Sequence, residues 1–153
     1  MRRPTFNAVL VKPSSIALIW LGIVIGVSFI ATPIKFAAPS LDLPTALEVG
    51  RVTFRLLARV EWFLAVALVA AAWLGRVRPS WSVWLAIAVV VLEATWLMPA
   101  LGARSDAIRA GAAVSPSSLH TVFIAAELLK CAALAHAAVA LTRPWPSAAR
   151  ARG

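Results

Sequence analysis

The chain has 153 residues, of which 61% are hydrophobic and 14% are charged, and its formal net charge is +9. A soluble domain has about a quarter of its residues charged, and disorder needs low hydrophobicity, so the composition excludes both classes. The basic residues lie between apolar runs, so we expect contact with lipid headgroups and no binding of nucleic acid. The composition therefore predicts a single integral membrane domain over residues 1–153.

The first apolar run extends from Ile16 to Ile34 without a charged residue, and Lys35 follows it. A bilayer core about 30 Å thick needs about 20 residues of helix, so this run predicts a membrane-spanning helix over 14–36. The run is longer than the apolar part of a signal peptide, which is about 7–15 residues. We therefore expect the segment to be retained rather than cleaved.

The second run, Trp62 to Leu74, is too short to cross a bilayer by itself. It can be extended backwards, because Thr45 and Glu48 have the spacing of a capping box at a helix start. The sequence thus predicts one long helix over 46–74. Its first part carries charged residues at spacings of three and four, which we expect to lie along one face at the membrane interface: Glu48, Arg51, Arg55 and Arg59.

Two further apolar runs complete the pattern. The third ends at Pro99 and predicts a helix over 81–99, followed by a short interfacial helix over 105–111. The fourth follows Pro116 and stops before Pro144, which predicts a helix over 117–142. The predicted fold class is all-α, an integral membrane four-helix bundle with both termini on one side.

The distribution of basic residues predicts which side that is. The side of the termini has eight basic and no acidic residues: Arg2, Arg3, Lys12, Arg76, Arg78, Arg143, Arg150 and Arg152. The other side has six basic residues, Lys35, Arg51, Arg55, Arg59, Arg104 and Arg109, mixed with Asp42, Glu48, Glu61 and Asp106. Because cytoplasmic loops carry the excess of Lys and Arg, we expect cytoplasmic termini in a bacterial-type inner (plasma) membrane.

Ionisable residues inside the predicted crossings are costly, so they are candidates for a functional site. Glu93 and Glu127 both lie about 12 Å below the expected outer ends of their helices. Glu61 lies about 9 Å below the outer face, with Arg59 slightly shallower and Lys130 one turn deeper than Glu127. Their shared depth predicts an outward-facing site for a cation or a proton-linked ligand.

A purely structural role is the alternative for the same residues. Glu127 with Lys130, and Glu61 with Arg59, would then neutralise each other within one helix or hold the bundle together. In that case, removal of Glu127 would leave Lys130 as an unpaired buried cation. Sequence alone leaves both alternatives open.

Other chemistry has little support in the sequence. His120, Glu127 and Cys131 share one helix face, but a metal would need a fourth ligand from another helix, and His136 points about 160° away from His120. We therefore predict no metal and no cofactor. The sequence has no nucleophile triad or phosphate-binding glycine loop, so we expect no enzymatic activity. The tryptophans fit an aromatic belt at the membrane interfaces: Trp20, Trp62, Trp73, Trp81, Trp84, Trp96 and Trp145.

Several motifs resemble the small four-helix membrane family typified by transmembrane protein 205. They are a glycine-bearing first helix at Leu21–Phe29, an exit through Pro33 and Phe36, a basic entry at Gly50–Arg59, and Ser118–His120 opening the last helix. The resemblance implies a membrane location and four crossings, without an established activity. The chain departs from the family pattern at Glu127 and Lys130, where a plain helix is expected.

Two functions follow as hypotheses. In the first, the chain is a small transporter, channel or ligand-binding bundle that uses its intramembrane charges. In the second, it is an accessory or assembly subunit whose charges contact a larger membrane complex or a second copy of the chain. Charges directed around a cavity would favour the first, and charges on one outer flank would favour the second.

The predicted topology can be tested by labelling single cysteines with a reagent that does not cross the membrane. Cysteines replacing Arg78 and Ala148 should be protected from reagent added outside the cell, because both positions are expected in the cytoplasm. A cysteine replacing Asp106 should react. Labelling at position 148 from outside would contradict both the number of crossings and the orientation.

Overall fold

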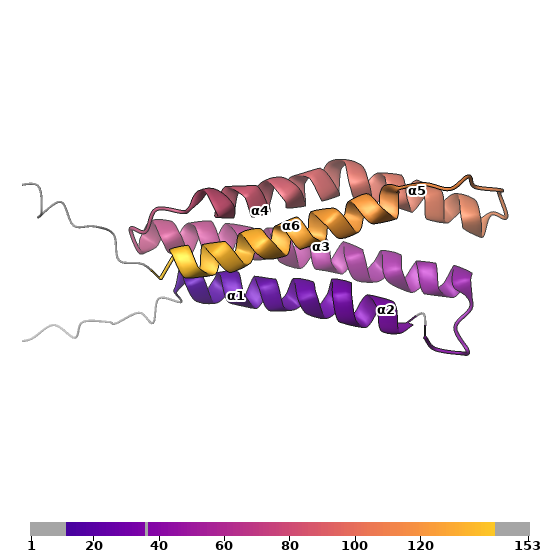
Figure 1. The fold of residues 1–153 in the computed structure, drawn as a ribbon, viewed down its shortest axis with the longest axis horizontal. Helices are drawn as coiled ribbons and strands as arrows, with labels where there is room; N and C mark the ends of the chain where they lie inside the picture. Colours follow the sequence, from indigo (N-terminus) through magenta and orange to yellow (C-terminus); the bar gives the residue numbers. More distant parts are fainter. Residues whose placement is uncertain (1–11, 36, 143–153) are drawn as a thin grey trace, which may run out of the picture.

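The structure is a computed structural model that describes residues 12–35 and 37–142. Every regular element within these residues is helical (Figure 1). The elements are α1 (Pro13–Val24), η1 (Ile25–Ala31), α2 (Thr32–Lys35), α3 (Leu43–Leu74), α4 (Trp81–Leu92), η2 (Glu93–Leu97), α5 (Met98–Arg109) and α6 (Leu119–Ala140). They join into four helical rods that are long and apolar enough to cross a membrane: Pro13–Lys35, Leu43–Leu74, Trp81–Arg109 and Leu119–Ala140. The all-α class and the four membrane-length helices are thus confirmed.

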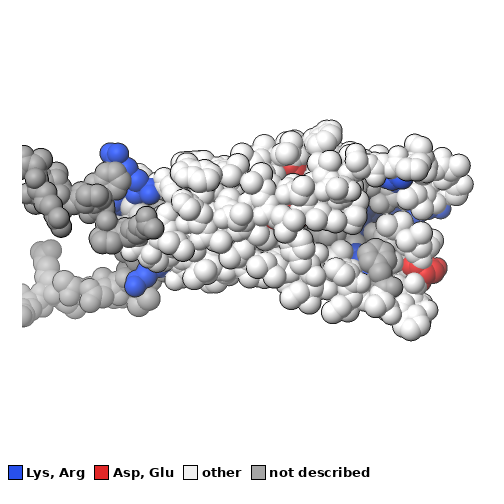
Figure 2. Space-filling view, in the orientation of Figure 1, with Lys and Arg blue, Asp and Glu red and all other residues white. Residues whose placement is uncertain are grey.

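The four rods lie side by side along one long axis (Figure 1). Helix α6 packs against both α1 and α4, α1 also packs against α3, and α5 contacts α3 as well. The two ends of the described chain and the turn at 75–80 lie at one end of the bundle, which we call the terminal end. The connections at 37–42 and 110–118 lie at the opposite end, the loop end. On the face shown in Figure 2, charged side chains gather at these two ends, and the surface between them is almost uncharged.

Helix α3 begins earlier than the sequence predicted. The Asp42 side chain accepts a hydrogen bond from the Thr45 amide at 2.9 Å, so Asp42 is the N-cap and the expected capping box at Thr45 is wrong. Pro44 lies in the first turn, where a missing N–H leaves no hydrogen bond unmade. The 46–74 helix therefore extends over Leu43–Leu74. The 117–142 helix is shorter than expected, because it begins at Leu119 and ends at Ala140.

The third rod differs most from the expectation. The sequence predicted a helix over 81–99 and a separate one over 105–111, whereas the chain stays helical from Trp81 to Arg109. Proline interrupts a regular helix because its ring clashes with the carbonyl four residues earlier. Here the wider π-helical turn η2 ends two residues before Pro99 and contains Thr95, four positions before it, so it accommodates the ring. Pro33 follows η1 in the same way in the first rod.

Two groups of buried apolar side chains fill the bundle. The larger one, the terminal-end core, includes Trp20, Leu68 and Leu134 and takes residues from all four rods. The smaller one, the loop-end core, consists of Val89, Leu97, Phe123 and Ala126. Between the two groups lie buried charged residues, which have no counterpart in an ordinary apolar core.

The Asp42 cap predicts a local dependence on pH. Hydrogen bonds donated by the Thr45 side chain and backbone lower the pKa of the Asp42 carboxyl. A lowered pKa in the folded state means that the cap stabilises the start of α3 above about pH 4 and loses this effect as the pH falls through the lowered value. Hydrogen exchange of the Thr45 amide in detergent should therefore accelerate in acid relative to Asp42→Asn, because asparagine caps without ionising. Equal protection of both proteins at every pH would contradict this role.

Candidate functional site

Lys130 is the centre of the buried charged group. Its side chain is 0% exposed, and its ammonium nitrogen forms ion pairs with Glu61 Oε1 at 2.8 Å, Glu93 Oε2 at 2.5 Å and Glu127 Oε1 at 3.0 Å. We call these four residues the ionic cluster. An ammonium has three N–H donors, and each is matched here by one carboxylate. The structure thus brings together four of the five residues that the sequence singled out.

Each rod contributes to this arrangement. Glu61 comes from α3, and Glu127 and Lys130 lie one turn apart on α6. Glu93 is the first residue of the π-helical turn η2, and turns of this kind are frequent at functional sites. The first rod supplies Trp20, whose Nε1 donates a hydrogen bond to Glu61 Oε1 at 3.1 Å. Polar contacts between helices therefore link all four rods at one level.

Trp20 is a residue that the sequence interpretation missed. We expected it in an aromatic belt, but its side chain is 0% exposed inside the bundle. The other described tryptophans are 41–80% exposed, and Trp145 lies outside the described residues. A usable signal was its position, because Trp20 lies about one helical turn inside the first apolar run rather than at its end. Its indole needs a hydrogen-bond acceptor when it is buried, and Glu61 supplies one.

The charges of the ionic cluster do not balance. Three carboxylates around one ammonium leave a formal charge of −2 when all four groups are ionised. In addition, Glu93 Oε1 and Glu127 Oε2 are buried without a hydrogen-bond partner among the described residues. Uncompensated charge and unpartnered polar atoms are both costly in an apolar interior. A bound proton or small cation would relieve both costs, so cation or proton binding is the chemistry that this geometry favours.

Arg59 does not join the cluster. The sequence paired it with Glu61, but its side chain is exposed, and the ion pair of Glu61 is with Lys130. Residues two positions apart on a helix do not face each other, which explains the difference. The second expected pair, Glu127 with Lys130, does form. However, Lys130 has two further carboxylates, so the expectation that loss of Glu127 would leave it unpaired is wrong.

The residues considered as metal ligands are separated. The described part of the chain contains no group of three His, Cys, Asp or Glu side chains arranged to hold a metal ion. His120 lines a cavity near the loop end, whereas Cys131 packs against the terminal-end core. His136 Nδ1 lies 2.9 Å from Ser82 Oγ, with the Trp81 ring beside it. The combination of His120, Glu127 and Cys131 is therefore not a metal site in this structure.

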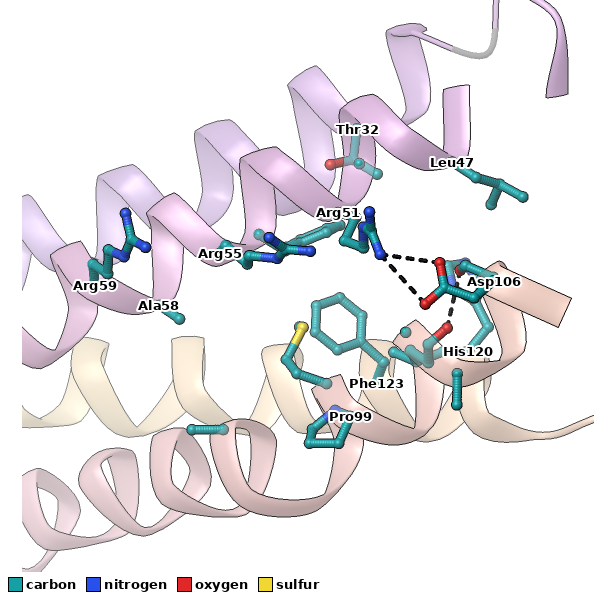
Figure 3. Close-up of a pocket in the computed structure, with 18 residues that line it drawn as sticks. Thr32, Leu47, Arg51, Arg55, Ala58, Arg59, Pro99, Asp106, His120 and Phe123 are labelled. Carbon is teal, nitrogen blue, oxygen red and sulfur yellow. Dashed lines mark hydrogen bonds and ion pairs between the residues drawn. The ribbon is translucent and has the colours of Figure 1, made fainter. Parts of the chain in front are cut away.

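A cavity of about 580 Å³ lies toward the loop end, between α3, α5 and the start of α6 (Figure 3). Ala58, Ala94 and Phe123 line it, and each is within about one helical turn of a carboxylate of the ionic cluster. The cluster itself is buried and does not line the cavity. Phe54 and Phe123, also in the lining, meet edge to face with ring centroids 5.1 Å apart. This aromatic pair joins α3 to α6 within the lining.

No family model matches the chain, and neither curated proteins nor solved structures provided a match. The resemblance to the family of transmembrane protein 205 therefore stays a prediction.

The geometry predicts an asymmetry between the members of the ionic cluster. Lys130→Met removes the partner of three buried carboxylates and should destabilise the protein by about 3–5 kcal/mol. Glu127→Gln leaves Lys130 with two carboxylates and should cost less, about 1–3 kcal/mol. Thermal unfolding in detergent measures both effects.

A neutral cluster serves as the control. Lys130→Met combined with glutamine at positions 61, 93 and 127 removes all buried charge and should recover most of the lost stability. An unchanged unfolding temperature for Lys130→Met alone would show that the ion pairs do not hold the bundle together.

Proposed function

We propose that the chain crosses a bacterial-type inner membrane four times, with cytoplasmic termini, and that the ionic cluster is the proton-binding centre of a small transporter or ligand-binding bundle. The observation that carries this proposal is the excess of carboxylates around Lys130, with two carboxylate oxygens lacking a partner. Intramembrane carboxylates and their basic partners are a common basis for proton relays in transporters.

The lengths of the rods support this placement in a membrane. Helix α3 has 32 residues, which corresponds to about 48 Å against a bilayer core of about 30 Å. The excess of about 18 Å corresponds to about 12 residues, so the charged start of α3 extends beyond the core at the loop end. The terminal end carries Lys12, Arg76 and Arg78, in keeping with a cytoplasmic position, while Arg2, Arg3, Arg143, Arg150 and Arg152 lie outside the described residues.

Proton binding would act on the contacts that hold the rods together. Protonation of Glu93 would weaken its ion pair with Lys130, and this pair joins η2 to α6. The same change would leave Lys130 with Glu61 and Glu127, so the bundle would remain connected. Because the cavity begins about one turn away, movement of η2 would change its floor at Ala94. This arrangement links proton occupancy to the shape of a binding site.

The inward direction of the charges argues against an accessory subunit, and the cluster lies about one helical turn from the cavity without lining it. A subunit that uses its charges to contact a larger complex needs them on an outer flank. The four residues of the ionic cluster instead point into the bundle and are no more than 4% exposed. The proposal therefore requires no partner protein for the cluster.

Infrared spectroscopy of the chain reconstituted in lipid vesicles tests proton binding directly. We expect a carbonyl band from a protonated carboxyl group that disappears as the pH rises. Glu93→Gln and Glu127→Gln should each reduce the pH-dependent change, because they remove carboxyls with an unpartnered oxygen.

Glu48→Gln is the matched control, since Glu48 is an exposed carboxylate at the loop end that pairs with Arg109. It should leave the buried-carboxyl band unchanged. Absence of a pH-dependent carboxyl band in the unmodified protein would overturn the proposed function.

A further inference from the structure

The α3 wall of the cavity carries three arginines in one row. Arg51, Arg55 and Arg59 are four positions apart, so they lie on the same helix face, and all three line the cavity (Figure 3). At the shallow end of the row, Arg51 is bound by Asp106 at 3.0 and 3.3 Å. The other two arginines lie one and two turns further along α3, toward the level of the ionic cluster, and their side chains are exposed.

The acidic residues near the cavity are already engaged. Arg109 pairs with Glu48 at 3.1 Å and lies 3.7 Å from Asp106, which also holds Arg51. Two carboxylates and two guanidinium groups thus form a balanced network that ties α3 to α5. Arg55 and Arg59 form no ion pair or hydrogen bond with any residue in 12–35 or 37–142. Arg51 adds a buried Nε without a hydrogen-bond partner. The cavity therefore has an excess of positive charge and of unused donors.

The remainder of the lining is mostly apolar. Met98 and Pro99 come from α5, and Phe123 comes from α6 on the side opposite the arginines (Figure 3). The volume of about 580 Å³ lies within the usual range for pockets that hold small molecules. A small inorganic anion would leave this apolar surface uncovered, whereas a neutral apolar molecule would leave the guanidinium groups without a counter-charge. The lining fits a ligand that has both an acidic group and an apolar body.

We propose that this cavity binds an anionic amphiphile, a molecule with a phosphate or carboxylate head and an acyl chain. The head lies between Arg55 and Arg59, whose planar guanidinium groups match the oxygens of such a group in pairs. The chain packs against Met98, Pro99 and Phe123. The site is separate from the ionic cluster and does not depend on the proton binding proposed for it. A free amphiphile and an anionic phospholipid of the membrane share this chemistry.

Thermal unfolding of the full chain in a neutral detergent measures binding with four probes. Dodecyl phosphate represents a free amphiphile, and dioleoyl phosphatidylglycerol represents an anionic phospholipid. Stabilisation by dodecyl phosphate alone supports a free amphiphile, and stabilisation by phosphatidylglycerol as well supports a membrane phospholipid. Dioleoyl phosphatidylcholine has the same chains without net charge, and inorganic phosphate has the charge without a chain. An equal effect of phosphatidylcholine and phosphatidylglycerol, or of inorganic phosphate and dodecyl phosphate, would overturn the proposal.

Two substitutions and a matched control locate the site. Arg55→Gln and Arg59→Gln should each weaken dodecyl phosphate binding by about 10- to 100-fold, since each removes a charge-assisted contact. Arg104→Gln makes the same change of charge on α5, but Arg104 does not line the cavity, so it should bind like the unmodified protein. A loss of affinity in Arg104→Gln as large as in Arg55→Gln would show that general attraction to the loop end, and not this cavity, binds the anion.

Gly102→Leu keeps the proposal testable if an arginine variant fails to fold. Gly102 lines the cavity, and a Cβ at this position would meet no heavy atom within 4 Å. Leucine also favours a helix more than glycine, so the bundle should tolerate it. The larger side chain occupies part of the cavity without changing any charge, and it should weaken dodecyl phosphate binding at least tenfold. Unchanged affinity in Gly102→Leu would by itself exclude this cavity as the site.

Discussion

The ion pairs of Lys130 constrain the whole bundle. A buried ammonium is tolerated only where carboxylates surround it, and here these carboxylates come from three of the four rods. Trp20 attaches the remaining rod through its hydrogen bond to Glu61. The apolar contacts around the cluster, many of them to alanine, are compatible with several rotations and shifts of the helices. The polar contacts of Lys130 and Trp20 lie at one depth in the bundle. They fix which face of each helix turns inward and how far each helix extends beyond this depth.

The ionic cluster also divides the interior of the bundle into regions that follow one another along its long axis. The terminal-end core lies on one side of the ionic cluster and the smaller loop-end core on the other. Beyond the loop-end core follow the arginine-lined cavity and the ion pairs between α3 and α5. Negative charge is thus in excess at the cluster and positive charge in the neighbouring cavity. An anion bound in the cavity would offset this positive charge and would thereby favour proton uptake at the cluster a short distance away.

Local signals in the sequence predicted the features that depend on one helix at a time. Hydropathy located the four helices, and counting along each helix placed Glu61, Glu93 and Glu127 at one depth, the level at which Lys130 joins them. Features that depend on neighbouring helices were missed. The burial of Trp20 follows from its contact with α3, and the separation of Arg59 from Glu61 follows from the rotation of that helix. The cavity also depends on the third rod continuing as a helix past Pro99. The sequence predicted that the helix ends there, because proline usually interrupts a regular helix.

The π-helical turns change which sequence positions of a rod face the interior of the bundle. A π-helical turn accommodates one residue more than an α-helical turn, so the pattern of inward-facing positions slips by one residue, about 100° of helical phase, across it. In the third rod this slip occurs between the apolar stretch of α4 and the polar face of α5. It is what lets one continuous rod direct valines at the other rods in its first half and Asp106 at Arg51 in its second. A rod of uniform pitch would turn one of these two faces away from the rest of the bundle.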